Sequence, residues 1–246
     1  MPGAFPALMV NSPPSITLRP VERHVDRRKA LTLAVLLWLG FAVTTWCVAH
    51  GRTTAFDRAG LMLWRQADLY PSGPAGLLEA VRDITALGGV LLRNLFALMA
   101  IVALFFLRLR REGILLGMTI VLGWGVNIGL KLLVGRARPQ IVPHLMDAGG
   151  NSFPSGHSFN SALVYVTIAL AFAAMSPRLS VRMTIIGFAL MLSILIAWSR
   201  VWLGVHWPTD VIAGWLGGAG WAFLASALLY RPAVVADRMM PEEEND

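Results

Sequence analysis

The chain alternates long apolar runs with shorter polar segments. Six runs approach the roughly 20 residues that an α-helix needs to cross the hydrocarbon core of a bilayer. The runs 158–175 and 182–198 are the shortest of the six. The pattern predicts an all-α, polytopic membrane protein with six transmembrane helices at 30–49, 89–107, 113–134, 158–175, 182–198 and 211–230.

Composition supports a membrane protein. Hydrophobic residues make up 56% of the 246 residues and charged residues 14%, whereas a soluble domain carries about 25% charged residues. The first run begins after a stretch of 29 residues and has no obvious cleavage site behind it, so it predicts a retained helix and not a signal peptide. The single cysteine, Cys47, excludes an intramolecular disulfide and a cysteine-rich metal site.

The basic residues predict how the chain is oriented. Clusters at 27–29 and 108–111 place both termini in the cytoplasm by the positive-inside rule. The net charge of +7 includes no long basic tract, so we interpret it as membrane topology and expect no nucleic-acid partner. The predicted organisation is a cytoplasmic tail at 1–29, a membrane domain at 30–232 and a second cytoplasmic tail at 233–246. The outer segment 50–88 is either an amphipathic helix on the membrane or a packed loop.

Polar residues interrupt the apolar pattern in three places. Because polar groups near a membrane core are costly, their presence needs a reason. One cluster ends the third run, one opens the fourth, and one lies between the fifth and sixth, so a six-helix count brings all three to the same membrane face. This motif region spans 131–210. Its members are Lys131, Arg138 and Pro139, then Pro154 to His157, then Ser199, Arg200, His206 and Asp210.

The cations of these clusters favour phosphate binding. Guanidinium groups match phosphate oxygens in pairs, and snorkelling to the interface explains one of these cations but not three of them. Lys131 and Arg138 share a helix face if the helix continues that far, although Gly135 and Pro139 oppose this. Ser155 and Gly156 resemble a helix start, where free N–H groups face an anion.

His206 and Asp210 are four residues apart and lie within hydrogen-bond reach if the segment is helical. A carboxylate on one imidazole nitrogen fixes the tautomer and leaves the other nitrogen nucleophilic. A metal site is the competing interpretation, but the neighbouring cations would repel a metal ion. We therefore expect a catalytic site without a metal.

These residues resemble the type 2 phosphatidic acid phosphatase superfamily, which includes the vanadium haloperoxidases. The family pattern is Lys-x6-Arg-Pro, then Pro-Ser-Gly-His, then Ser-Arg-x5-His-x3-Asp, and this sequence matches every position. The resemblance implies that His206 attacks phosphorus to give a phosphohistidine, that Asp210 orients it, and that His157 protonates the leaving alkoxide and then activates water. It also implies that the phosphoryl oxygens are bound by Lys131, Arg138, Ser155, Gly156 and Arg200, and that no cofactor takes part.

The expected substrate is a lipid phosphate: polyprenyl diphosphate, phosphatidylglycerol phosphate, phosphatidate or a lipid A phosphate. We expect a bacterial inner membrane, with the site facing the periplasm or the outside. The alternatives are a lipid phosphotransferase, a haloperoxidase and a transporter. The six apolar runs disfavour a haloperoxidase, and the gathering of charges at one membrane face disfavours a transporter. Arg136 is either a ligand of a second phosphate or a solvated loop residue. Arg93 and Asn94 form a further polar pair to which no motif gives a role.

Overall fold

The computed structural model describes residues 18–20, 26–229 and 234–236, and within them the chain forms helices and two short strands. The strands β1 (Leu18–Pro20) and β2 (Val234–Ala236) pair antiparallel, with Arg19 opposite Val235. The predicted tails 1–29 and 233–246 fall largely outside the described residues. The helices are α1 (Arg27–Ala49), α2 (Thr54–Met62), α3 (Leu77–Leu87), α4 (Val90–Phe106), α5 (Arg110–Val134), α6 (Gly156–Ala173), α7 (Leu179–Trp202) and α8 (Pro208–Leu229).

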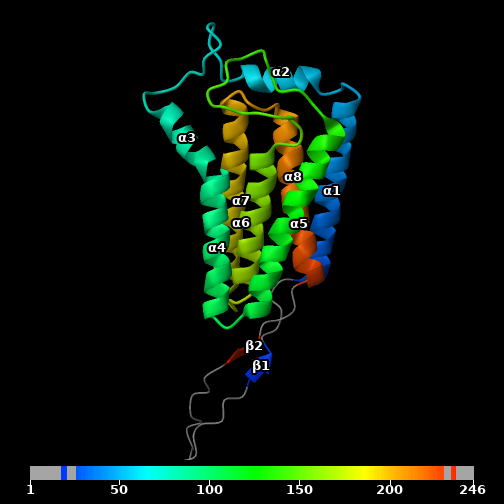
Figure 1. The fold of residues 1–246 in the computed structure, drawn as a ribbon, viewed down its shortest axis with the longest axis vertical. Coiled ribbons are helices and arrows are strands. Elements are labelled where there is room, and N and C mark those ends of the chain that lie inside the picture. Colours follow the sequence, from blue (N-terminus) through cyan, green and yellow to red (C-terminus); the bar gives the residue numbers. More distant parts are fainter. Residues whose placement is uncertain (1–17, 21–25, 230–233, 237–246) are drawn as a thin grey trace, which may run out of the picture.

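Six of these helices, α1 and α4 to α8, run side by side as a bundle, and α2 crosses one end of it (Figure 1). Five helices of the described part are long and apolar enough to span a bilayer, and α3 with α4, bent by 46° between them, forms the sixth candidate span. The six predicted runs coincide with α1 and α4 to α8. The expected all-α fold is confirmed, with a bent pair as its second span.

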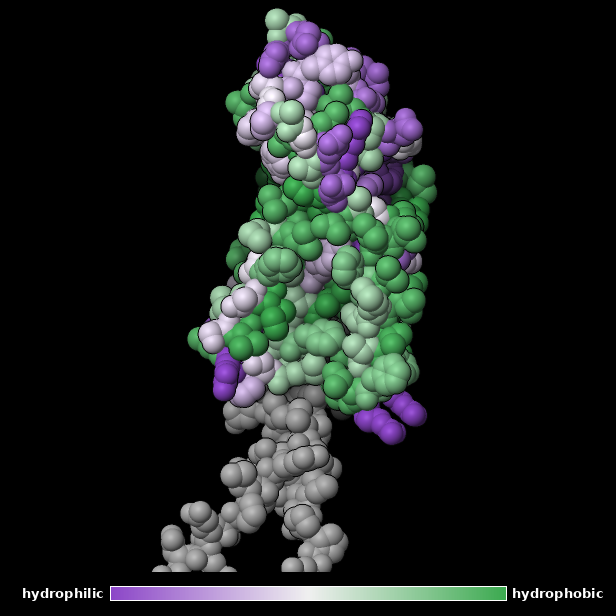
Figure 2. Space-filling model, turned by 90° about the vertical axis from the view of Figure 1, so that its left-hand side faces the viewer, coloured by the Kyte–Doolittle hydropathy of each residue, from purple (hydrophilic) through white to green (hydrophobic). Residues whose placement is uncertain are grey.

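The surface of the bundle is apolar around its middle. A hydrophobic belt separates a polar cap at the α2 end from scattered polar residues at the other end (Figure 2). Large apolar side chains on the helices of the bundle are exposed, among them Leu36, Leu98, Val121 and Phe188. A continuous exposed apolar surface of this extent is what a bilayer covers. The protein is therefore an integral membrane protein.

Helices α6 and α8 form the centre of the bundle, and glycines let their backbones touch. A Cβ built on Gly218 would lie 2.0 Å from the backbone oxygen of Phe159, and one on Gly214 would lie 2.7 Å from that of Ser155. Small residues permit such close helix contacts in membranes. The contact fixes the start of α6 against the start of α8, where two of the predicted clusters lie.

The bend between α3 and α4 lies beside this centre. A Cβ on Gly88 would meet Cγ2 of Ile196 at 2.3 Å and Cδ2 of His157 at 3.2 Å, so only glycine fits there. The hydroxyl of Tyr165 donates a hydrogen bond to the backbone oxygen of Leu87 at 2.6 Å, which ties the end of α3 to α6. The bend therefore contacts the first turn of α6.

Candidate active site

All three predicted clusters meet at the α2 end of the bundle. They lie at the end of α5 and the segment after it, at the start of α6, and across the turn from α7 to α8. The helix that carries Lys131 does not continue to Arg138, as Gly135 and Pro139 indicated. Helix α5 ends at Val134, and Gly135 takes a left-handed conformation with φ 61°, which glycine adopts without strain. Arg138 thus enters the site from an extended segment.

His206 stands between a carboxylate and a guanidinium. Its Nδ1 lies 3.5 Å from Oδ2 of Asp210, and its Nε2 lies 3.0 Å from Nη1 of Arg138. The segment from His206 to Asp210 is not one helix, because α8 begins at Pro208; the turn before α8 brings the pair together. The imidazole is 2% exposed. Burial lowers the pKa of His206 to about 4, although the Asp210 carboxylate acts in the opposite direction.

Ser152 completes this arrangement and was not expected from the motifs. Its hydroxyl donates a hydrogen bond to Oδ2 of Asp210 at 2.5 Å and lies 3.2 Å from Nδ1 of His206. The same carboxylate oxygen accepts from the backbone N–H of Trp207 at 3.0 Å. Two donors, the Ser152 hydroxyl and the Trp207 N–H, therefore hold one oxygen of Asp210 at the Nδ1 side of the imidazole, and Nε2 is left on the side of Arg138.

Arg136 is neither a solvated loop residue nor a free cation. It donates to Oδ1 of Asp210 at 2.7 Å and to Oδ2 of Asp57 at 2.6 Å. Asp57, on α2, is fully buried and accepts from the backbone N–H and the hydroxyl of Thr209. Motif spacing gave no indication of Asp57 or Thr209. Helix α2 is thus joined to the first turn of α8. This part of 50–88 is a helix and not a loop, and it packs on the protein through Asp57.

The start of α6 faces Lys131. Ser155 is the N-cap of α6, and its hydroxyl accepts a hydrogen bond from the backbone N–H of Ser158. A Cβ on Gly156 would lie 3.5 Å from Cε of Lys131. The ammonium group donates to the backbone oxygen of Asn151 at 2.8 Å. A cation and the free N–H groups of a helix start therefore lie together, as anion binding requires.

Arg200 and His157 lie on the α3 side of the site. Arg200 is 2% exposed; its Nη1 donates to the hydroxyl of Thr85 at 2.9 Å, and its buried Nε has no hydrogen-bond partner. The ring of His157 packs against Gly88. The structure thus brings the three motifs together at one end of the bundle.

The charges of the site separate into two groups. Arg136 has two carboxylate partners, Asp57 and Asp210. Among residues 26–229, no carboxylate lies within 4.0 Å of Lys131, Arg138 or Arg200. Arg200 is buried, and Lys131 and Arg138 are partly buried. Cations withdrawn from water without counter-ions are costly, and a phosphate would supply the missing charge.

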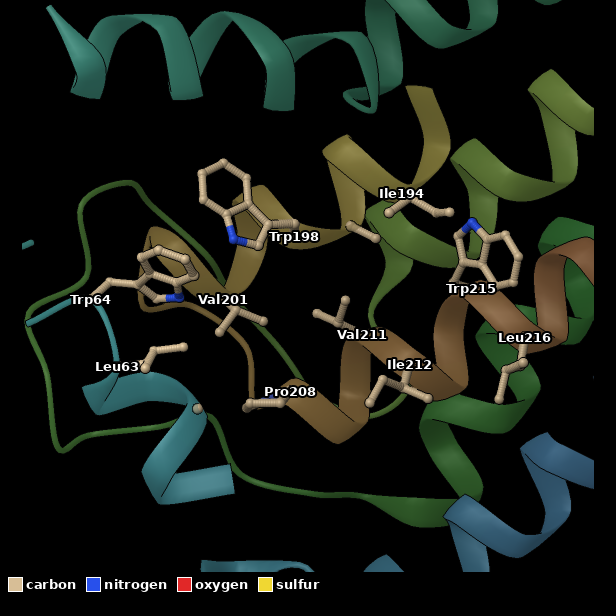
Figure 3. Close-up of a pocket in the computed structure, with 12 residues that line it drawn as sticks. Leu63, Trp64, Ile194, Trp198, Val201, Pro208, Val211, Ile212, Trp215 and Leu216 are labelled. Atoms are coloured by element: carbon tan, nitrogen blue, oxygen red, sulfur yellow. The ribbon is translucent and has the colours of Figure 1, made fainter. Parts of the chain in front are cut away.

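An apolar groove of about 410 Å³ lies near the site but is separate from it. It runs between α7 and α8 under α2 and is lined by Leu63, Trp64, Trp198, Val211 and Trp215, among others (Figure 3). None of the charged residues or histidines of the three motifs lines this groove. The groove belongs to the lipid-facing surface.

Comparison with known proteins agrees with this geometry. The PAP2 superfamily matches residues 112–232. Phosphatidylglycerophosphatase B of Bacillus subtilis is 38% identical over 143 residues, covering 56% of this chain and 68% of the relative. Undecaprenyl-diphosphatase of Sulfolobus acidocaldarius is 35% identical over 130 residues, covering 50% of this chain and 57% of the relative.

A solved structure extends the match to most of the fold. The crystal structure of the transmembrane PAP2-type phosphatidylglycerolphosphate phosphatase from Bacillus subtilis superposes with a TM-score of 0.70 at 30% identity, covering 78% of this chain and 93% of that one. Sequence and fold agree, and the expected family is confirmed: the chain belongs to the PAP2 superfamily.

Proposed function

We propose that this protein hydrolyses the phosphate ester or diphosphate of a membrane lipid through a phosphohistidine on His206. The enzyme class, a phosphatase of lipid phosphates, follows from its family and from the names of its relatives. One observation supports the mechanism above the others. Asp210 and Ser152 hold the Nδ1 side of the imidazole, while Nε2 lies beside the cation Arg138.

The first step forms a bond between Nε2 of His206 and phosphorus. A neutral imidazole is needed, and a pKa near 4 supplies it at neutral pH. The P–O bond to the lipid breaks, and the leaving oxygen keeps the electron pair of that bond. This oxygen then takes a proton from His157. Asp210 stabilises the positive charge that develops on the imidazole.

The second step reverses these roles. His157 takes a proton from water, the water oxygen attacks phosphorus, and the P–N bond breaks to return a neutral His206. Through both steps Lys131, Arg138 and Arg200, with the Ser155 hydroxyl and the backbone N–H of Gly156, bind the phosphoryl oxygens. Such positioned charges are the main source of catalysis in phosphoryl transfer.

The orientation in the membrane is part of the proposal. Basic residues at 27–29, 108–111, 178 and 182 lie at the ends of helices opposite the site. The positive-inside rule then places this end in the cytoplasm and the site at the outer face. A membrane-impermeant thiol reagent should label Arg111→Cys in a Cys47→Ser background only after the inner face is made accessible. Labelling in intact cells would show that the orientation is the opposite of the one proposed.

The test is phosphate release from a panel of lipid phosphates in detergent containing EDTA. Wild type should release phosphate without an added acceptor, which separates hydrolysis from phosphotransfer. His206→Ala should lose at least a thousandfold in kcat, and His50→Ala, at the exposed end of α1, is the matched control. Acid quenching should trap labelled phosphate on wild type. Equal rates for His206→Ala and wild type would reject the nucleophile.

A further inference from the structure

A second buried polar cluster lies on α4 and α5, next to the phosphate-binding cations. Arg93 is 5% exposed. It donates to the backbone oxygen of Gly88 at 3.2 Å and to Oδ1 of Asn94, and its guanidinium carbon lies 5.7 Å from the centre of the Trp124 ring. Within the described part of the chain, no carboxylate lies within 4.0 Å of it. A buried cation in a membrane helix is costly without an anion.

Two N–H donors on α5 have no acceptor. Nδ2 of Asn127 and Nε1 of Trp124 are buried and make no hydrogen bond, and Asn127 is 3% exposed. Buried donors are nearly always satisfied in folded proteins. Trp124, Asn127 and Lys131 are spaced by three and four residues, so they follow one face of α5. The unpaired donors therefore continue from the phosphate-binding site along that face.

The cluster lies on the side of the site where the leaving group departs. Oδ1 of Asn127 would lie 3.6 Å from a Cβ built on Gly156, the first residue of α6. Gly88 links the cluster to His157. Its backbone oxygen accepts a hydrogen bond from Arg93, and the ring of His157 packs against it. A group attached to the oxygen that His157 protonates would therefore lie next to the cluster.

We propose that Arg93, Asn127 and Trp124 form a second anion subsite, which binds a phosphate on the leaving side of the substrate. This inference rests on the proposed function and names its substrate class, lipids with a second phosphate close to the scissile one. With a diphosphate, Nε2 of His206 bonds to the terminal phosphorus and the P–O bond to the bridging oxygen breaks. That oxygen keeps its electron pair, takes the proton of His157 and leaves as part of a lipid monophosphate. Arg93 neutralises the charge of this product.

The experiment compares farnesyl diphosphate with farnesyl monophosphate, which share one hydrocarbon tail, using the full chain in detergent. Wild type should give the higher kcat/KM with the diphosphate. Arg93→Gln should lower the ratio of the two kcat/KM values at least tenfold. Trp124→Phe should lower it about threefold; it removes an N–H that has no partner and keeps the ring, so the fold loses no hydrogen bond. Arg58→Gln, an exposed arginine on α2, is the charge-matched control and should leave the ratio unchanged.

A second pair of lipids separates the two sources of such a phosphate. Phosphatidylglycerol phosphate carries it across a glycerol spacer, and phosphatidate lacks it. If wild type prefers the lipid with two phosphates only in the farnesyl pair, the subsite binds the second phosphate of a diphosphate. If this preference appears only in the glycerolipid pair, the subsite binds a second phosphate separated by a glycerol spacer. No preference in either pair, or equal losses on both members of a pair in Trp124→Phe and Arg93→Gln, would overturn the subsite. Failure of wild type to hydrolyse any of the four lipids would instead reject the proposed function.

Discussion

Arg136 donates a hydrogen bond to Oδ1 of Asp210, the carboxylate oxygen that does not face His206. The guanidinium therefore fixes the carboxylate from behind, and its other amino group is held by the buried Asp57 of α2. Through this chain of contacts, an aspartate from outside the motifs helps to position the imidazole.

Removing the charge of Asp57 should weaken both the fold and the reaction. Breaking a buried ion pair from one side costs about 3–5 kcal/mol, and Asp57 is fully buried with Arg136 and Thr209 as partners. We expect Asp57→Asn to lower the melting temperature and to reduce kcat at least tenfold. The measurements are thermal unfolding and phosphate release in detergent, with Asp83→Asn, an exposed aspartate of α3, as control.

A double variant tests whether the two residues act as a pair. Asp57→Asn together with Arg136→Gln should lose less than the sum of the single losses, because either single variant already breaks the ion pair between the two residues. Strictly additive losses would mean that Asp57 and Arg136 act independently.

Loss of the Ser152 hydroxyl should affect the rate more than binding. Its hydrogen bond to Asp210 involves a charged group, and such bonds contribute about 1.5–3 kcal/mol, which corresponds to a loss of about ten- to a hundredfold in rate. We expect Ser152→Ala to lower kcat by this factor while KM stays within threefold. Ser161→Ala removes a hydroxyl that bonds backbone oxygens within α6 and should change kcat less than twofold. A change in KM alone would place Ser152 in substrate binding.

The motifs predicted the parts of this site that chemistry constrains. Lipid imposes long apolar helices, so the spans could be recognised from the sequence, and the pattern from Lys131 to Asp210 located the charges. Ser152 and Asp57 could not be recognised. Ser152 acts through a segment without regular structure between α5 and α6, and Asp57 is 79 residues from Arg136 along the chain. No spacing rule connects residues that only tertiary packing brings together.

The bend before α4 was missed for a related reason. The segment that forms α3 mixes Leu77 and Val81 with Glu79, Arg82 and Asp83, so its hydropathy is too low for a span taken alone. Its apolar side packs against α7 and the loops, as Val81, 1% exposed, shows. This mixed pattern left an amphipathic helix and a packed loop as alternatives, and it did not indicate a helix that meets α4 at a bend of 46°.

The pKa of His206 predicts a loss of stability in acid. The folded-state value is about 4 and the ordinary value is 6.5, so between these pH values the unfolded chain binds the extra proton. Stability therefore falls as the pH drops from 6.5 to 4, by at most about 3 kcal/mol, since each of the 2.5 units corresponds to about 1.36 kcal/mol. Thermal unfolding of wild type and His206→Gln across this range checks it: the variant should lose less stability, and parallel curves would contradict the assignment.

The same shift predicts the acidic side of the activity profile. Attack needs neutral His206, so the kcat/KM of native enzyme should stay high below pH 6.5 and fall near pH 4. The protonated acid, His157, limits the basic side, which gives a bell-shaped profile. The measurement is kcat/KM against pH, corrected for the ionisation of the substrate phosphate. A monotonic rise from pH 5 to 9 would contradict this division of roles between the histidines.

The contact between α6 and α8 gives a prediction about the frame of the site. A methyl group at Gly218 would lie 2.0 Å from the backbone oxygen of Phe159, and a backbone atom inside a helix cannot move away as a side chain can. Forcing extra volume into a packed interior costs about 1–3 kcal/mol or more. We expect Gly218→Ala to lower the melting temperature by several degrees. It should also reduce kcat at least tenfold, because α6 carries His157 and α8 carries Asp210.

Gly125→Ala is the matched control, since its methyl group meets nothing within 4 Å and alanine favours the helix by up to about 1 kcal/mol. If both alanine variants unfold at the same temperature and retain the same kcat, the close approach of the two helices does not position the catalytic groups.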